Sequence, residues 1–372
     1  MLPAAFLPAL LAARHPAPMA RRRWLGLLAA SLLPVPAAQA LPMRILRFPR
    51  DHGSHPELRT EWWYATGHAE AEGGHAYGFQ ITFFRSRVEG TQTLPSAFAA
   101  RQLVFAHAAL TDLQEGKLHH DQRIARAGFG IADAAEDDTR VRLRDWSLAR
   151  DSRSGIYAAE APGVDFGLSL RLQPTQALLL QGQAGLSRKG PQASQASYYY
   201  SQPQLAVEGR IALTGRPPMK VRGKAWLDHE WSDALLHPEA VGWDWIGMNL
   251  VDGSALTAFR LRRTDGSALW AGGSWRPAGG EARAFEHDEV RFEPLRFWTS
   301  PLSRARYPVQ CRVSTPAGRF EVRALLDDQE LDSRASTGAI YWEGLSDLRD
   351  SAGQRVGRGY LEMTGYAQAL RL

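Results

Sequence analysis

The stretch GWDWIGMNLVDGSALTAFRLRRTDGSALWAGGSW, residues 242–275, decides the fold class. It contains three short runs in which apolar and polar residues alternate, and Asp-Gly pairs at 252–253 and 265–266 separate them. Asp-Gly favours the positive backbone dihedrals that tight hairpin turns need. The stretch therefore predicts a three-stranded antiparallel meander.

Similar runs fill the rest of the chain. EWWYATGHAEAEGGHAYGFQITFFRSR, residues 61–87, predicts a hairpin with one strand to Ala69, a Glu-Gly-Gly turn at 72–74 and a second strand through Phe84. Long apolar stretches with the helical period of 3.6 do not occur after the first 40 residues. More than a dozen alternating runs together predict an all-β protein.

Three pairs of similar segments suggest that the β-structure is duplicated. They occur in the same order in the two halves: FFRSR (83–87) with AFRLR (258–262), Trp62-Trp63 with Trp243 and Trp245, and QLAVEG (204–209) with YLEMTG (360–365). We interpret them as two copies of a β-unit, residues 41–214 and 215–372, with the junction in the Thr-Gly-Arg-Pro-Pro segment at 214–218. Enough antiparallel strands per copy would close a barrel, whose interior is filled by side chains or holds one small ligand.

The first 40 residues have the composition of an export signal. They contain Arg14 and the cluster at 21–23 but no acidic residue, then an apolar run and the small-x-small pattern Ala38-Gln39-Ala40. The arginine cluster also resembles a twin-arginine signal. Met19 is an alternative start. We therefore expect a periplasmic or secreted protein that is not transmembrane once processed, because no later segment has the length of a membrane span.

Charge and cysteine content narrow the function. The chain has 44 basic and 39 acidic residues, and four of the basic ones lie in the predicted signal, so the remainder is nearly neutral. No block of Lys and Arg indicates a nucleic-acid partner. Cys311 is the only cysteine, which excludes an internal disulfide. It lies in an alternating run and is interpreted as a small strand residue.

Polar residues gather among aromatic ones in three places. These are DHGSHPELRTEWWY at 51–64, WLDHEW at 226–231 and YWEG at 341–344. SYYYS at 197–201 adds three tyrosines. If 226–231 is a strand, Asp228 and Glu230 face one side while His229 and Trp231 face the other.

Several chemistries remain open for these clusters. A metal site would combine His52 or His55 with His229 and a carboxylate, but no pair has metal-ligand spacing within one element, and we predict no metal. A nucleophilic hydrolase could use Ser54 or Ser201, although the Gly-x-Ser-x-Gly turn is absent.

General acid–base catalysis needs only one acid whose pKa is raised in an apolar pocket. The acids beside aromatic residues are Asp228, Glu230, Glu343 and Glu61. The alternative is that each carboxylate simply accepts hydrogen bonds from Arg, Tyr or backbone N–H groups and closes a barrel. The tryptophans have the same two interpretations, as lining of a ligand pocket or as packing at barrel ends and between the copies.

The chain resembles the AttH/carotenoid 1,2-hydratase family from about Phe48 to Tyr366. The resemblance rests on DHGSHPELRTEWWYATGH, SYYYSQPQLAVEGRIALTG, VRGKAWLDHEWSD, GWDWIGMNLVDGSAL, IYWEG and GRGYLEMTGY. It implies two lipocalin-like barrels in an exported or membrane-associated bacterial protein.

The resemblance also implies two kinds of function. The enzyme branch adds water to the terminal double bond of acyclic carotenoids without a cofactor, and its His-x-Trp motif matches His229 and Trp231. Its proton-donating Tyr-x-Asp would fall in ALTAFRLRR, where this chain has Phe259 and Leu261. The donor would then be Asp228, Glu230 or another acid, or the hydration chemistry is absent. The AttH branch implies handling of an apolar molecule beside an ABC transporter.

We therefore expect an exported lipocalin-like protein that binds an apolar ligand of lipid or isoprenoid type, with an ABC transporter as candidate partner and no cofactor. The alternative is a hydratase or, failing that, a hydrolase acting on such a ligand. The candidate catalytic residues are Asp228, His229 and Glu230. The candidate binding residues are Trp231, Trp243, Trp245, Trp62, Trp63, Tyr199, Trp342, Glu343, His52 and His55.

Overall fold

The computed structural model describes residues 40–233 and 236–370. The export signal predicted at 1–40 lies outside this part, apart from Ala40. The described helices are two short 3-10 turns, η1 (Arg50–His52) and η2 (Glu89–Thr91). None of the described helices could span a membrane.

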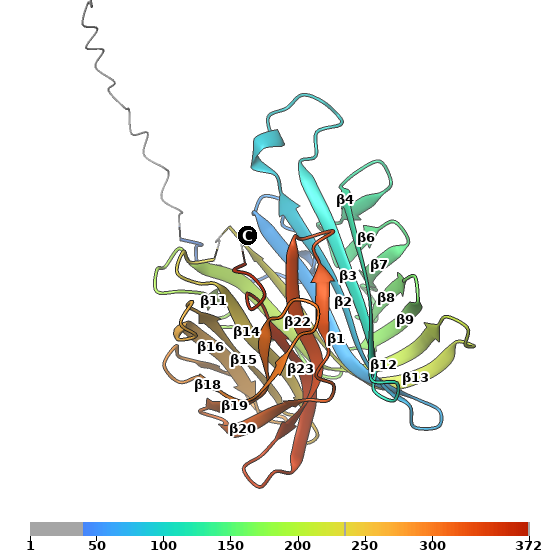
Figure 1. Cartoon of the computed structure of the whole chain (residues 1–372). Helices are drawn as coiled ribbons and strands as arrows, with labels where there is room; N and C mark the ends of the chain where they lie inside the picture. Colours follow the sequence, from blue (N-terminus) through green and yellow to red (C-terminus); the bar gives the residue numbers. More distant parts are fainter. Residues whose placement is uncertain (1–39, 234–235, 371–372) are drawn as a thin grey trace, which may run out of the picture. The chain divides into compact units, whose positions relative to one another are not determined.

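The first sheet is antiparallel, with strand order β4-β3-β2-β1-β13-β12-β9-β8-β7-β6-β5, and β10 and β11 pair with β12 (Figure 1). Its strands are β1 (Thr60–Ala71), β2 (Ala76–Arg87), β3 (Gln102–Asp112), β4 (Lys117–Arg126), β5 (Ala132–Ala134), β6 (Arg140–Leu143), β7 (Trp146–Arg150), β8 (Tyr157–Pro162), β9 (Phe166–Gln173), β10 (Leu179–Leu180), β11 (Leu186–Arg188), β12 (Ala196–Leu213) and β13 (Met219–Ser232). The sheet curls until β3 and β4 contact β6, so it is nearly closed into a barrel.

The second sheet has the order β17-β16-β15-β14-β23-β22-β20-β19-β18, and β21 pairs with β22. Its strands are β14 (Gly242–Leu250), β15 (Ala255–Arg262), β16 (Ala268–Arg276), β17 (Arg283–Phe285), β18 (Arg291–Thr299), β19 (Arg306–Thr315), β20 (Gly318–Ala324), β21 (Glu330–Ser333), β22 (Ala339–Arg349) and β23 (Arg355–Met363). The all-β, lipocalin-like prediction is confirmed.

The predicted hairpins form for the expected reason. The meander at 242–275 becomes β14, β15 and β16, and the glycines of its two Asp-Gly turns have φ values of 92° and 83°. The hairpin at 61–87 becomes β1 and β2. Cys311 is a buried residue of β19, as predicted.

Strand order supports the duplication and corrects two of its details. In each sheet the first strand pairs with the last, β1 with β13 and β14 with β23, and a meander continues outward from the first. YLEMTG lies on the last strand of its sheet, whereas QLAVEG lies on β12, the last but one, so this pair of segments is not equivalent. The predicted junction at 214–218 is the turn between β12 and β13, and the chain leaves the first sheet only after Ser232.

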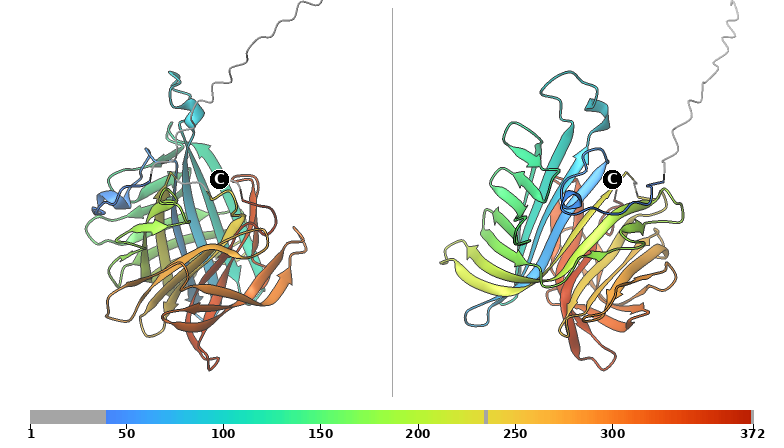
Figure 2. Two further views of the ribbon diagram at one scale, coloured as in Figure 1. Left: turned by 90° about the vertical axis from the view of Figure 1, so that its left-hand side faces the viewer. Right: turned by 180° about the vertical axis from the view of Figure 1, so that it is seen from behind.

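The two sheets contact each other through their first and last strands. β23 contacts β1, and β22 contacts β2; the views in Figures 1 and 2 show these red strands against the blue ones. Each sheet has its own apolar core. A third apolar cluster draws side chains from both sheets, including Tyr64, Trp226, Trp245, Phe259, Leu345 and Tyr360. The layer between the sheets is therefore rich in aromatic rings.

Candidate functional site

Strand alternation divides the WLDHEW motif between two environments. The motif lies at the end of β13, between β1 and β12. His229 and Trp231 point into the first sheet, where Trp231 belongs to the core. Asp228 and Glu230 point to the other face, where neighbouring Trp226 belongs to the cluster shared by the sheets. The predicted separation of the acids from His229 is confirmed.

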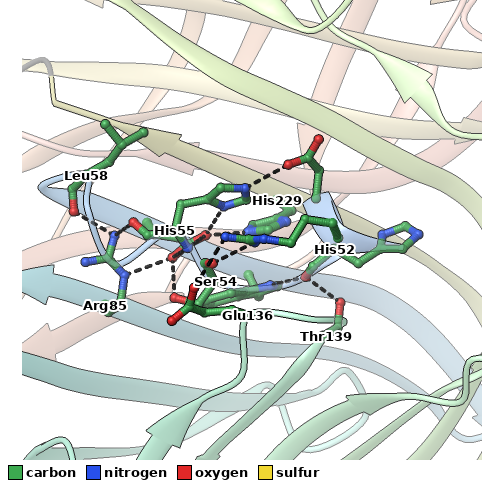
Figure 3. Close-up of polar contacts among 12 residues, drawn as sticks. His52, Ser54, His55, Leu58, Arg85, Glu136, Thr139 and His229 are labelled. Atoms are coloured by element: carbon green, nitrogen blue, oxygen red, sulfur yellow. Dashed lines mark hydrogen bonds and ion pairs between the residues drawn. The ribbon is translucent and has the colours of Figure 1, made fainter. Parts of the chain in front are cut away.

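On the inner face, one buried carboxylate is the centre of a hydrogen-bond network. Glu61 Oε1 lies 2.8 Å from His55 Nδ1 and 2.9 Å from His229 Nε2. Its other oxygen, Oε2, accepts bonds of 2.8 Å from Arg85 Nε and from Ser54 Oγ. Figure 3 shows His55, His229, Arg85 and Ser54 directed to this point.

The charges of this inner network balance. Burial would raise the pKa of Glu61, but its bonds to His229 and His55 hold that pKa well below the usual range. Burial would lower the pKa of His55, yet its bonds to Asp51 and Glu61 raise it. The His55 ring thus lies between two carboxylates, with the Arg85 guanidinium beside Glu61.

His229 and His52 are neutral members of the same region. Burial lowers the pKa of His229 to about 4, so its Nε2–H donates to Glu61 as a neutral imidazole. Burial also lowers the pKa of His52 to about 3. His52 Nδ1 is 2.7 Å from the Tyr200 hydroxyl and does not contact Glu61. Neither imidazole carries charge at neutral pH.

The structure brings together the groups of the two-histidine, one-carboxylate hypothesis. His55, Glu61 and His229 offer ligand atoms within 4.8 Å of one another. However, both ring nitrogens of His55 are hydrogen-bonded to carboxylate oxygens, Nδ1 to Glu61 and Nε2 to Asp51, and the second Glu61 oxygen is occupied by Arg85 and Ser54. A metal ligand must be deprotonated. We therefore interpret this cluster as a self-contained network that holds η1 against β1 and β13.

The nucleophilic-serine alternative finds no support in the contacts of its two candidates. Ser54 donates to Glu61, and Ser201 Oγ donates to Asp228 Oδ1 over 2.5 Å. Neither hydroxyl has a histidine as hydrogen-bond partner among the residues that the structure describes, and both residues are buried. A serine nucleophile needs a positioned base within hydrogen-bond reach.

On the outer face, Asp228 and Glu230 are held by hydrogen bonds. Asp228 Oδ1 accepts from Trp226 Nε1 at 2.6 Å as well as from Ser201, and Oδ2 accepts from the Tyr199 hydroxyl at 2.7 Å. Glu230 Oε1 accepts from Ser197 Oγ at 2.5 Å and forms an ion pair of 3.0 Å with Lys189 Nζ.

The second sheet adds two more acids to this layer. Glu343 on β22 and Glu362 on β23 are direct cross-strand partners. Glu343 is 3 % exposed, and its Oε1 has no hydrogen-bond partner among the described residues. The buried hydroxyl of Tyr64 on β1 faces Glu343, and its hydrogen bond to that carboxyl opposes the rise in the pKa of Glu343.

We call Asp228, Glu230, Glu343 and Glu362 the acid cluster, and three of its members, Asp228, Glu343 and Glu362, have raised pKa values. Burial raises the pKa of Asp228 to about 7, although its three hydrogen bonds oppose the shift. Burial, together with the charges of Asp228 and Glu230, raises the pKa of Glu362 to about 7. Burial and the neighbouring Glu362 raise the pKa of Glu343 well above its usual value. Carboxyls from both sheets therefore influence one another.

Aromatic rings surround the acid cluster. Trp245 is in edge contact with Tyr64 at 5.4 Å and with Trp226 at 6.3 Å, and its Nε1 donates to the Tyr199 hydroxyl over 3.1 Å. Phe259 lies in the same apolar cluster, with Lys189 Nζ 4.3 Å from its ring centre. Trp62, Trp243, Lys189 and Glu362 are among the side chains that remain partly exposed here.

The predicted site residues thus occupy three places. The layer between the sheets holds Asp228, Glu230, Glu343, Tyr199, Trp62, Trp243 and Trp245. The inner network and its surroundings hold His52, His55, Trp63, His229 and Trp231; the rings of His55 and Trp231 are stacked at 4.1 Å, and those of Trp63 and His229 at 4.7 Å. Trp342 lies apart, in the core of the second sheet, where Nε1 donates to the Asp327 carbonyl.

Sequence reasoning missed Glu362, Tyr64 and Lys189. The sequence offered one signal for Glu362, in the segment YLEMTG. Its neighbours Leu361 and Met363 are core residues, so Glu362 must face the opposite side of the strand. Nothing in the sequence indicated that this side meets the other sheet.

Comparisons with known proteins agree with this structure. The AttH-like family model matches residues 39–366. The crystal structure of a protein assigned to AttH from Nitrosomonas europaea is 49% identical and covers 89% of this chain and 100% of its own, with a TM-score of 0.82. Kievitone hydratase from Nectria haematococca shares the fold at 14% identity, with a TM-score of 0.68 over 87% of this chain and 94% of its own. Among curated proteins, none matches. The chain belongs to the AttH-like family.

Proposed function

We propose that this protein is a cofactor-independent hydratase, which adds water to a carbon–carbon double bond of an apolar, isoprenoid-type molecule. The observation that carries the proposal is the acid cluster: four carboxyl groups from two sheets lie among aromatic rings, and three of them have raised pKa values. The shared fold with a protein named a hydratase supports the same reaction class.

Glu343 is the proton donor in this proposal. Alkene hydration needs an acid that keeps its proton at neutral pH and has an oxygen free to face the substrate. Glu343 is buried and has a raised pKa, and its one side-chain hydrogen-bond partner among the described residues is the Tyr64 hydroxyl of the same layer. The two oxygens of Asp228 already accept three hydrogen bonds, and Glu230 is paired with Lys189. These two acids, predicted as alternative donors, are less free to deliver a proton.

In the proposed step, Glu343 gives one proton to the alkene and receives one proton back from water. The π electrons form a new C–H bond with the Glu343 proton, which leaves a carbocation on the more substituted carbon and a carboxylate on Glu343. A water molecule then forms the C–O bond and loses one proton, which returns to that carboxylate. Trp62, Tyr64 and Trp245 stabilise the cation through their ring faces, while the cluster's negative charge stabilises it electrostatically.

This chain lacks the aspartate that the family resemblance places on β15 as proton donor, and the acid cluster offers a replacement. Phe259 occupies part of the stretch where the resemblance places the donor, and it is the direct cross-strand partner of Trp245. Phe259 therefore lies in the layer that holds the acid cluster. We propose that Glu343 and Glu362, from β22 and β23, supply the acid that β15 lacks.

A search for hydration products tests the proposal. Purified protein would be incubated with acyclic isoprenoids that carry a terminal trisubstituted double bond, including lycopene-type polyenes, and products examined by mass spectrometry. We expect a product heavier by one water molecule. An apolar ligand that binds or co-purifies without any mass gain would contradict the hydratase and support the carrier hypothesis. Export and an ABC transporter partner remain predictions.

A further inference from the structure

A hollow of about 370 Å³ lies where the two sheets meet, away from the acid cluster. Its titratable lining comes from both sheets: His68 and Glu70 from β1, Arg222 and Lys224 from β13, and Arg355 and Arg358 from β23. Both sheets therefore contribute to its wall.

Positive charge dominates this basic hollow. Four of its side chains are cationic and one, Glu70, is acidic. Lys224 Nζ donates to the neutral amide oxygen of Gln204 over 2.8 Å. The Arg355 guanidinium forms no hydrogen bond or ion pair with any described residue. Two cations of the hollow thus lack a carboxylate partner.

The other two arginines have acidic partners outside the lining. Arg358 Nε donates to Asp347 Oδ1 over 2.9 Å. Arg222 Nε is 3.4 Å from Glu208 Oε1, and both side chains are largely exposed, so this contact contributes little. Arg222 also lies directly across from Glu70 in the register of β1 and β13. These acids leave Lys224 and Arg355 uncompensated.

His68 shows that the cations converge on one point. Burial, together with the charges of Arg358, Lys224 and Arg355, lowers the pKa of His68 to about 4. Three cations from two sheets therefore act on a single imidazole. A neutral imidazole can still donate one N–H to an anion.

The basic hollow is separate from the acid cluster. Lys224 and Asp228 lie on the same face of β13, four residues or roughly 13 Å apart along the strand. The buried ring of Trp226 lies between them on that face. The Asn249 amide closes the wall by binding the backbone of Ala225 and of Gln204. An inference about the hollow thus does not depend on the hydration chemistry.

We propose that the basic hollow binds an anionic oxygen group, a carboxylate or phosphate, with Lys224 and Arg355 as its principal contacts and His68 as a neutral donor. A fixed pocket with two uncompensated cations fits such a group better than a neutral one, because charge-assisted hydrogen bonds are about twice as strong as neutral ones. The group can belong to a free anion or to the headgroup of an amphiphile.

The test uses the whole purified protein and two kinds of probe. Inorganic phosphate is titrated by calorimetry at constant ionic strength. Vesicles of phosphatidylcholine, with and without phosphatidylglycerol, are tested by co-sedimentation. Lys224→Gln and Arg355→Gln are compared with Lys117→Gln and Arg319→Gln, which remove exposed cations elsewhere. We expect binding at least about tenfold weaker in the first pair and unchanged in the second.

An NMR titration of His68 reports on the hollow directly. A bound anion must raise the His68 pKa, because it counteracts the surrounding cations, and Arg355→Gln must raise it without any ligand. Phosphate binding alone would indicate a free anion, and binding only to phosphatidylglycerol vesicles would indicate a headgroup. The proposal is overturned if neither probe binds, or if the control variants weaken binding as much as Lys224→Gln and Arg355→Gln.

Discussion

Glu343 and Glu362 lie directly opposite each other on β22 and β23, and no cation pairs with either carboxyl among the described residues. Directly opposed side chains of an antiparallel pair have Cβ atoms about 5 Å apart. Two carboxylates at that distance in a buried layer cannot both ionise readily. The pair therefore keeps at least one proton at neutral pH, and the two groups titrate together.

Removing one member of the pair should move the pH dependence of the other. Glu362→Gln removes a neighbouring negative charge, so the pKa of Glu343 should fall. If Glu343 must be protonated for catalysis, the pH at which kcat/KM declines should then fall as well. The measurement is the pH–rate profile of the two proteins. A decline at an unchanged pH would show that Glu362 does not set the pKa of the catalytic acid.

Stability should fall as the pH rises through neutrality, in part because of Asp228. Its pKa is raised from 3.8 to about 7 in the fold, so its contribution is fully present below pH 3.8 and is lost as the pH passes 7. Asp228→Asn mimics the protonated form. We expect urea unfolding to show that the free energy of unfolding falls less in this variant than in wild type when the pH is raised from about 5 to about 8. The exposed control Asp288→Asn should behave as wild type, and identical losses in all three proteins would contradict the assignment.

The inner network should be costly to break. Glu61→Gln leaves the His55 ring with one partner fewer and the Arg85 guanidinium without its carboxylate, both in a buried site. Removing one member of a buried ion pair costs about 3–5 kcal/mol in the free energy of unfolding. Chemical denaturation would measure the loss. Glu136→Gln, which changes an exposed acid, should cost under about 0.5 kcal/mol; a similarly small cost for Glu61→Gln would refute the network.

Chelation should leave the protein unchanged. Since both ring nitrogens of His55 are hydrogen-bonded to carboxylates and Glu61 Oε2 is occupied by Arg85, dialysis against EDTA should not shift the melting temperature. Elemental analysis before dialysis checks the same point. Stoichiometric metal whose removal lowers the melting temperature, and whose binding is lost in His229→Gln, would show that the cluster is a metal site.

Much of the fold could be predicted because local patterns determine it. Asp-Gly turns and alternating runs located β1, β2 and the meander β14 to β16, and alternation alone separated Asp228 from His229. Each of these inferences depends on residues close together in the sequence or on the fixed period of a strand. The combination of His55, His229 and a carboxylate is different, because it follows from residue type alone and joins segments that are far apart in the sequence.

The rest depends on contacts between distant segments. Glu343 and Glu362 meet through the register of β22 and β23, and Tyr64 joins them because two sheets pack face to face. Alternation tells which face a residue occupies but not which strand or sheet lies opposite. The same limit explains why the sequence pairs YLEMTG of β23 with QLAVEG of β12, although the two strands are not equivalent. It also explains why the predicted junction between the units precedes β13 instead of following it.

The most direct test of the proposed function measures the rate at which the Glu343→Gln and Glu72→Gln variants hydrate the substrate in oxygen-18 water. Glu72 is exposed in the turn between β1 and β2, so its variant controls for the loss of a glutamate. We expect Glu72→Gln to incorporate oxygen-18 into the product alcohol at the wild-type rate. Glu343→Gln should be slower by about 100-fold or more, the contribution of a general acid, while circular dichroism confirms that it is folded. Equal rates for the two variants would contradict the assignment of Glu343 as the proton donor.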